Sequence, residues 1–299
     1  MIWGFSIALY LFLAGAGACA FAACALVALR KPEVSSFQKI GRVVSLAAVV
    51  IGMVLLMVDA RAGLMNPLRF TLLLGNFGSV MTWGVVFLGL FTVVNAITVV
   101  LAFMKKPLPK WLDVFGIVLA VCVAVYTGVL LGVVDTFPLW NLAVLPVLFF
   151  VSAVSTGIAT AALVARAVGE PPATLEPFQK LRAWLPPVEL AVVCVLLIAT
   201  FGAGPVGTAS VYALTTGGFA PAFWFGFVVV GLAVPFFLES GMVRRRVRAT
   251  AGGPPLDGGA GALPVAAIVG DVCVLVGGLL LRYLVIAAAL PLTVPALGI

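Results

Sequence analysis

The sequence predicts an all-α membrane protein with eight transmembrane helices; its composition, its apolar runs and its charge distribution all point to this class. Of the 299 residues, 64% are hydrophobic and 9% are charged, and the mean hydropathy is +1.29. A soluble fold cannot bury so much apolar surface, whereas a helical membrane protein exposes it to lipid. The isoelectric point near 9.5 is explained by basic cytoplasmic loops, so we expect a bilayer and no nucleic acid as partner.

The first four helices are predicted at 2–29, 43–58, 79–103 and 113–134. Each is an apolar run long enough to cross a bilayer, bounded by polar or helix-breaking residues. The first run lacks the basic n-region of a cleavable signal peptide, so we expect it to remain as a spanning helix.

The other four helices are predicted at 142–165, 187–202, 222–242 and 264–290. The run at 187–202 is short and ends at a glycine, which makes it the least regular of the eight. The count of eight is also supported by the loop charges, because a missed or an invented helix would disturb their alternation.

The basic residues alternate between loops. All 17 lysines and arginines lie in the first, third, fifth and seventh loops, except Arg61, Arg69 and Arg282. Cytoplasmic loops of membrane proteins carry the excess of Lys and Arg. The odd loops are therefore predicted to be cytoplasmic and both termini to lie on the non-cytoplasmic side, in a prokaryotic plasma membrane.

Two short motifs repeat along the chain. "SFQK" at Ser36–Lys39 returns as "PFQK" at Pro177–Lys180, and "WGVVFLGL" from Trp83 is echoed by "WFGFVVVGL" from Trp224, after the same number of residues. A repeat of this kind predicts two parallel halves. We expect one four-helix bundle at 1–134 and a second at 135–299.

Two tyrosines are predicted to lie at a similar depth. Tyr126 precedes Asp135 by nine residues, and Tyr10 follows Ile2 by eight. At 1.5 Å per residue, they lie about 13 and 12 Å below the non-cytoplasmic helix ends. Polar and aromatic residues gather at the same end of the first half, and we take them as candidate site residues: Asp59, Arg61, Ser79 and Trp83.

Each of these residues also has a structural interpretation. A tryptophan near a helix end, such as Trp83, is typical of an interfacial anchor. Asp59 and Arg61 could form an ion pair that caps a helix. Tyr10 or Tyr126 alone would be typical of a packed phenol bonded to a backbone carbonyl.

A second polar group is predicted at the cytoplasmic end of the second half. Glu189, Glu239 and Asp271 lie near helix ends, and Arg282 lies deeper in the last helix. Solvation at the interface accounts for Glu189 and Glu239 equally well. Asp271 and Arg282 are within the last helix, where ionisable groups are rare and often functional.

The histidine and cysteine content predicts which metal cofactors this chain does not hold. It contains no histidine, so we expect no haem b, which membrane bundles usually hold through histidines. The five cysteines all lie in apolar runs without a CxxC pair. We interpret them as small apolar residues and expect neither a metal site nor an iron–sulfur cluster in this chain.

A series of motifs extends along nearly the whole chain. They are "YLFLAGAGA" at Tyr10–Ala18, "DARAG…NPLRF" at Asp59–Phe70, "SVMTWGVVFLGLF" at Ser79–Phe91, "YTGVLL…PLWN" at Tyr126–Asn141, "FFVSAVSTG" at Phe149–Gly157 and "GGLLLRYLVIAAA" at Gly277–Ala289. Their order and spacing resemble the NrfD/polysulfide-reductase family of membrane subunits. The resemblance implies a quinone-reactive anchor of a molybdopterin-type oxidoreductase, with a menaquinone site in the first bundle. It also implies a four-cluster ferredoxin-like iron–sulfur subunit outside, beside a molybdopterin or cytochrome catalytic subunit.

The resemblance assigns roles to the candidate residues. Tyr126 matches the family tyrosine that contacts quinone, whereas Tyr10 stands where some members carry His. We therefore expect Tyr10, Tyr126, Asp59, Ser79 and Trp83 to bind menaquinone or menaquinol. Asp59, Arg61 and Tyr126 would take part in its oxidation or reduction. Glu189, Glu239, Asp271 and Arg282 would form a proton path through the second bundle.

Two other functions remain open from the sequence. Eight helices with an internal repeat are compatible with a secondary transporter, and a structural anchor without quinone is the other possibility. Transport without any partner subunit would favour the first, and a purified complex without menaquinone would favour the second. The terminal substrate and the direction of electron flow belong to the catalytic subunit and are not encoded in these residues.

Overall fold

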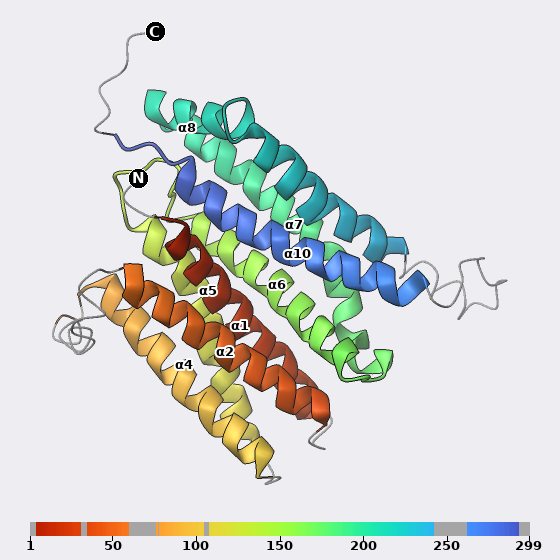
Figure 1. Ribbon diagram of the computed structural model, residues 1–299. Helices are drawn as coiled ribbons and strands as arrows, with labels where there is room; N and C mark the ends of the chain where they lie inside the picture. The colour runs from red at the N-terminus through yellow and green to blue at the C-terminus, as the bar shows by residue number, and fades with distance from the viewer. Residues whose placement is uncertain are drawn as a thin grey trace.

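The computed structural model describes residues 4–30, 35–59, 76, 78–104, 108–241 and 262–292. Within them the protein is helical and contains no strand. Eight helices are long and apolar enough to cross a membrane, as the sequence predicted. They run roughly side by side (Figure 1).

The first four spanning helices are α1 (Phe5–Arg30), α2 (Ser36–Asp59), α4 (Val80–Phe103) and α5 (Lys110–Gly132). α1 packs against α2 and α5, and α4 packs against the same two helices. Because successive helices alternate in direction, α1 begins where α2 ends. We call this end of the molecule the Phe5 end and the opposite one the Arg30 end.

The remaining spanning helices follow the same alternation. α6 (Leu145–Ala167) and α7 (Glu176–Phe201) are joined by the short 3-10 helix η1 (Pro172–Leu175). The seventh span, Ala222–Gly241, begins as the π-helix η2 (Ala222–Ala233), and α10 (Ala262–Ala287) is the last. α6 and η2 both pack against α7 and α10.

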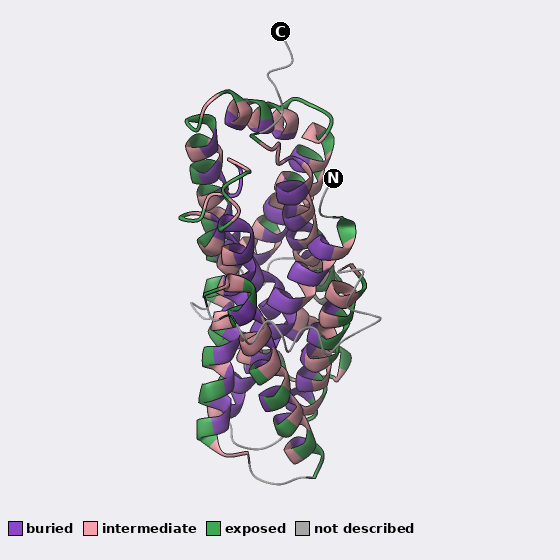
Figure 2. Ribbon diagram, turned by 90° about the vertical axis from the view of Figure 1, so that its left-hand side faces the viewer, coloured by how far each residue is buried: buried purple, intermediate pink, exposed green. Residues whose placement is uncertain are grey.

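α1 is the centre of the molecule. It contacts α2, α5, α6 and α10, and 78% of its apolar window is buried, against 28% for α2. Its small residues allow close approach, as small residues do between membrane helices: a Cβ on Gly17 would lie 3.0 Å from the Val49 side chain. Figure 2 shows the resulting buried interior and the exposed outer faces.

The outer faces carry large apolar side chains. Ile198, Phe225 and Phe237 are each at least 70% exposed, on α7 and along the seventh span. An apolar surface of this kind suits contact with lipid tails, because no water is present there to penalise it. The exposed apolar faces and the eight long helices together describe a multi-pass membrane protein.

Two helices begin earlier than the sequence indicated. α2 begins at Ser36 rather than at 43, and α7 begins at Glu176 rather than at 187. α7 passes through Pro186 and Pro187, although each proline removes a backbone donor from the helix. No sequence pattern indicated α8 (Pro205–Thr215), an 11-residue helix between α7 and η2 that lies at the Phe5 end (Figure 1).

Candidate functional site

Tyr10 and Tyr126 lie together near the Phe5 end. Tyr10 is in the second turn of α1 and is fully buried, while Tyr126, in the second half of α5, is 7% exposed. The two phenols are close enough to interact electrostatically. Among the described residues, the Tyr10 hydroxyl has no hydrogen-bond partner. Such a buried hydroxyl is unusual, because buried tyrosines nearly always bond to protein, water or ligand.

The surroundings of the two tyrosines come from α2 and α4. A Cβ on Gly52 of α2 would touch the Tyr10 ring at 3.5 Å, and the Tyr126 phenol lies directly against Gly84 of α4. Four helices of the first half therefore converge on this pair. Small residues on α2 and α4 provide the space that the two rings fill.

The other candidate residues of this end are more peripheral. Asp59 is the last residue of α2 and is half-buried; its Oδ1 would be 4.0 Å from a Cβ on Gly4, so the carboxylate lies beside the start of α1. Ser79 precedes α4 without a side-chain cap bond. Trp83 is 46% exposed and lies 5.9 Å from the Phe87 ring. Arg61 lies outside the described residues.

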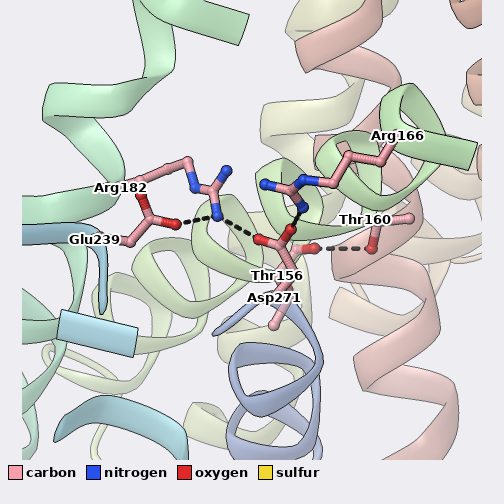
Figure 3. Close-up of polar contacts among 6 residues, drawn as sticks. All are labelled: Thr156, Thr160, Arg166, Arg182, Glu239 and Asp271. Carbon is pink, nitrogen blue, oxygen red and sulfur yellow. Dashed lines mark hydrogen bonds and ion pairs between the residues drawn. The ribbon is translucent and has the colours of Figure 1, made fainter. Parts of the chain in front are cut away.

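Four charged side chains meet near the Arg30 end of the second half (Figure 3). Arg182 of α7 donates to both Glu239 of the seventh span and Asp271 of α10. Arg166 of α6 donates to the other oxygen of Asp271. Two cations and two anions balance, which a buried cluster requires because an unpaired charge is costly away from water. Asp271 is fully buried, whereas the Arg166 side chain is 27% exposed.

A second buried polar group lies further into the same half. Arg282 is fully buried and donates from Nη1 to the Ser152 hydroxyl at 3.1 Å and to the Gly278 carbonyl at 2.8 Å. Glu189 is buried and lies close enough to Ser152 and Arg282 to interact with both. Ser152 therefore lies near both the carboxylate and the guanidinium. Within the described part of the protein, Nε and Nη2 of Arg282 have no partner.

Hydroxyl groups follow α6 from this group toward the Arg30 end. Ser152, Thr156 and Thr160 are four residues apart, so they share one face of the helix. Thr160 donates to the Thr156 carbonyl, and Thr156 donates to the Ser152 carbonyl, both at 2.8 Å. The face is directed at α10, since a Cβ on Gly278 would touch both Thr156 and Ser152.

The first half holds a comparable ion pair at its Arg30 end. Arg42 of α2 and Asp113 of α5 approach to 2.7 Å, with side chains 0% and 4% exposed, and the Phe21 ring lies over the Arg42 guanidinium. Arg42 and Arg182 each follow the first residue of their helix by six positions. Arg42 pairs with Asp113 in the first turn of α5, and Arg182 pairs with Asp271 of α10. Each half therefore contains an arginine–aspartate pair.

No three His, Cys, Asp or Glu side chains of the described ranges come together as a metal ion would require. Five cysteines are free thiols. The acidic side chains Asp113, Glu239 and Asp271 are instead paired with arginines.

Comparison with known proteins identifies the family. The family model described as polysulphide reductase, NrfD, matches residues 1–294. The chain belongs to the NrfD family.

Curated relatives agree with this assignment. The C subunit of the polysulfide reductase of Wolinella succinogenes is 31% identical over 267 residues, which cover 80% of this protein and 83% of the relative. Protein NrfD of Escherichia coli is 30% identical over 276 residues, covering 80% and 84%. A NrfD homolog of Haemophilus influenzae is 25% identical over 269 residues. The similarity therefore extends over most of each protein.

Several ion-paired residues of this NrfD-family protein were not predicted from the sequence. Arg42, Arg166 and Arg182 were counted among the loop charges, and Asp113 was taken as the start of a helix, yet all four form ion pairs. A signal was present in the sequence. Each arginine stands next to or within an apolar run, and the acidic partner occurs in another apolar run of the same half.

Proposed function

We propose that this protein is the quinone-reactive membrane subunit of a respiratory oxidoreductase complex. It would exchange electrons between menaquinol or menaquinone and an extracytoplasmic iron–sulfur subunit. The observation that carries the proposal is the fully buried hydroxyl of Tyr10 beside Tyr126, which has no hydrogen-bond partner among the described residues. Membership of the NrfD family, and a relative named as one component of a polysulfide reductase, support a subunit of this kind.

The residues between α1 and α5 fit a quinone headgroup. A quinone carbonyl accepts hydrogen bonds, and a phenol can donate one. The Tyr10 hydroxyl lacks a partner among the described residues, so a ligand oxygen would satisfy it. A menaquinone bound here would supply the two-electron, two-proton redox chemistry that the side chains of this protein lack.

The protein side chains would bind, orient and exchange protons. Tyr10 and Tyr126 would hold the two ends of the ring and keep it in the dry interior near the Phe5 end. Asp59, half-buried at the end of α2, would exchange protons with the aqueous side. Arg61 would set its charge state, and Ser79 and Trp83 would line the approach on α4.

We further propose that the Phe5 end faces the non-cytoplasmic side. The alternating loop charges support this orientation. The two sequence motifs that return after the same number of residues support two parallel halves, which would be the bundles α1–α2–α4–α5 and α6–α7–η2–α10. A four-cluster ferredoxin-like subunit would dock at the Phe5 end and pass electrons to a molybdopterin or cytochrome catalytic subunit.

The second half would carry protons from the Arg30 end. Arg182 links Glu239 and Asp271. Ser152 accepts a hydrogen bond from Arg282 and lies near Glu189. The hydroxyls of Thr156 and Thr160 lie along α6 on the face that these groups share. Intramembrane ionisable chains of this kind are typical of proton relays. Proteoliposomes that build no membrane potential during turnover would exclude this part of the proposal.

The quinone assignment is tested by conservative tyrosine variants of the purified complex. Tyr10→Phe and Tyr126→Phe each remove one donor, which weakens quinone binding or turnover about tenfold for a lost hydrogen bond. Tyr212→Phe is the matched control, because Tyr212 is 55% exposed on α8. Menaquinone should also copurify with the wild-type protein. Equal turnover in all three variants, or a complex without quinone, would reject the assignment.

A further inference from the structure

The Tyr126 phenol occupies the place where residue 84 would carry a side chain. A Cβ built on Gly84 would lie within 3.0 Å of both the hydroxyl oxygen and the ζ carbon of Tyr126, and real Cβ atoms essentially never come so close to a neighbour. The phenol of α5 therefore lies in a notch in the surface of α4. Only glycine leaves this notch open.

A second glycine of α4 shows that this close contact is particular to Gly84. Gly89 lies five residues further along the same helix, and a Cβ there would meet nothing within 4 Å. A glycine inside a helix costs stability relative to alanine. At Gly84 this cost is accompanied by the close contact with the Tyr126 ring, whereas Gly89 makes no comparable contact with the described residues.

We propose that Gly84 is a positioning residue for the quinone site: its missing side chain fixes the direction and depth of the Tyr126 hydroxyl beside Tyr10. This inference rests on the proposed function and deepens it. Tyrosine has two side-chain torsions, so a ring pressed against a neighbouring backbone keeps one orientation. A methyl group at position 84 would turn the ring aside and move its hydroxyl away from the position that a quinone oxygen would meet.

The position of the Tyr126 hydroxyl matters as much as its presence. A donor contributes to binding only within about 2.7–3.2 Å of its acceptor and with suitable alignment. Placement errors near 1 Å at a supporting residue are enough to disable a site. Gly84→Ala should therefore weaken quinone binding about as much as removing the Tyr126 hydroxyl, although Gly84 itself would not touch the quinone ring.

The experiment compares two glycine variants of the full-length protein in lipid nanodiscs. The probe is 2,3-dimethyl-1,4-naphthoquinone, and binding is followed by quenching of tryptophan fluorescence. Gly84→Ala should raise the dissociation constant roughly tenfold, the effect of one lost hydrogen bond. Gly89→Ala, which adds the same methyl in open space, should leave it unchanged. If both variants bind like wild type, the inference is overturned.

A leucine at position 126 separates positioning from general packing. Tyr126→Leu removes both the hydroxyl and the ring that fills the notch, so adding Gly84→Ala to it should neither weaken binding further nor lower thermal stability. Should Gly84→Ala alone fail to fold, Tyr126→Leu should restore folding. An additive effect, or no rescue, would show that Gly84 acts through another neighbour and would overturn the inference. Absence of probe binding by the wild-type protein would instead refute the proposed function.

Discussion

The buried pair of Arg42 and Asp113 allows a quantitative test of the packing of the first half. Replacing Asp113 with asparagine leaves the Arg42 guanidinium charged, with a side chain 0% exposed. Nε, Nη1 and Nη2 of Arg42 have no hydrogen-bond partner in the described part of the structure, so its charge is balanced only by the ion pair with Asp113. The variant therefore leaves an uncompensated charge between α2 and α5.

The expected loss follows from the burial of the pair. Removing one partner of a buried ion pair typically costs about 3–5 kcal/mol, because the remaining charge cannot be solvated. Removing both charges avoids this cost: apolar residues of similar volume are often neutral or stabilising at such sites. Arg42→Met combined with Asp113→Leu should therefore recover most of the stability that Asp113→Asn loses.

Thermal unfolding in detergent, followed with a thiol-reactive dye, measures the effect. Cys19 and Cys24 are buried and become reactive on unfolding, while the exposed Cys194 gives the starting signal. A loss near 3 kcal/mol lowers the midpoint by roughly 6–12 °C in a protein of this size. Asp135→Asn, at an exposed position, is the control and should change stability by less than about 0.5 kcal/mol.

Two outcomes would refute this reasoning. If Asp113→Asn unfolds at the same temperature as the Asp135→Asn control, the pair is solvated rather than buried. If the apolar double variant is less stable than Asp113→Asn, the ion pair itself contributes net stability, contrary to the desolvation argument.

Two further predictions concern the second half. Asp271→Asn should lower the thermal midpoint as strongly as Asp113→Asn, because Asp271 is fully buried and accepts hydrogen bonds from Arg166 and Arg182. A midpoint unchanged from wild type would contradict this cluster. Gly277→Ala should destabilise the protein, because a Cβ there would come within 3.0 Å of the Gly231 backbone, where η2 crosses α10. Gly241→Ala should not destabilise the protein, because a Cβ there meets nothing within 4 Å among the described residues. Equal thermal midpoints for the two alanine variants would contradict the close crossing.

The helices were predictable because their cause is local. Long apolar runs are visible in any window of the sequence, and the structure describes a spanning helix at each of the eight. The starts of α2 and α7 were missed for a physical reason. Arg42 and Arg182 look like loop charges in a one-dimensional reading, but their partners Asp113 and Asp271 allow both to lie inside the helices.

The candidate site was predictable only in part. Helix rise alone placed Tyr10 and Tyr126 at a similar depth, and the structure brings the two phenols together. The contact of Tyr126 with Gly84 was not foreseeable, because it depends on how α4 and α5 face each other. The proximity of Glu189, Ser152 and Arg282 likewise depends on the packing of three helices.

The central claim is that Tyr10 and Tyr126 bind a quinone headgroup in the interior near the Phe5 end. The most direct test is an electron cryo-microscopy map of the protein, in its complex and in lipid nanodiscs with menaquinone. The account predicts headgroup density between the two tyrosines, with quinone oxygens about 2.6–3.2 Å from the hydroxyls. Headgroup density at another place, with Tyr10 and Tyr126 packed against each other and no ligand between them, would contradict it.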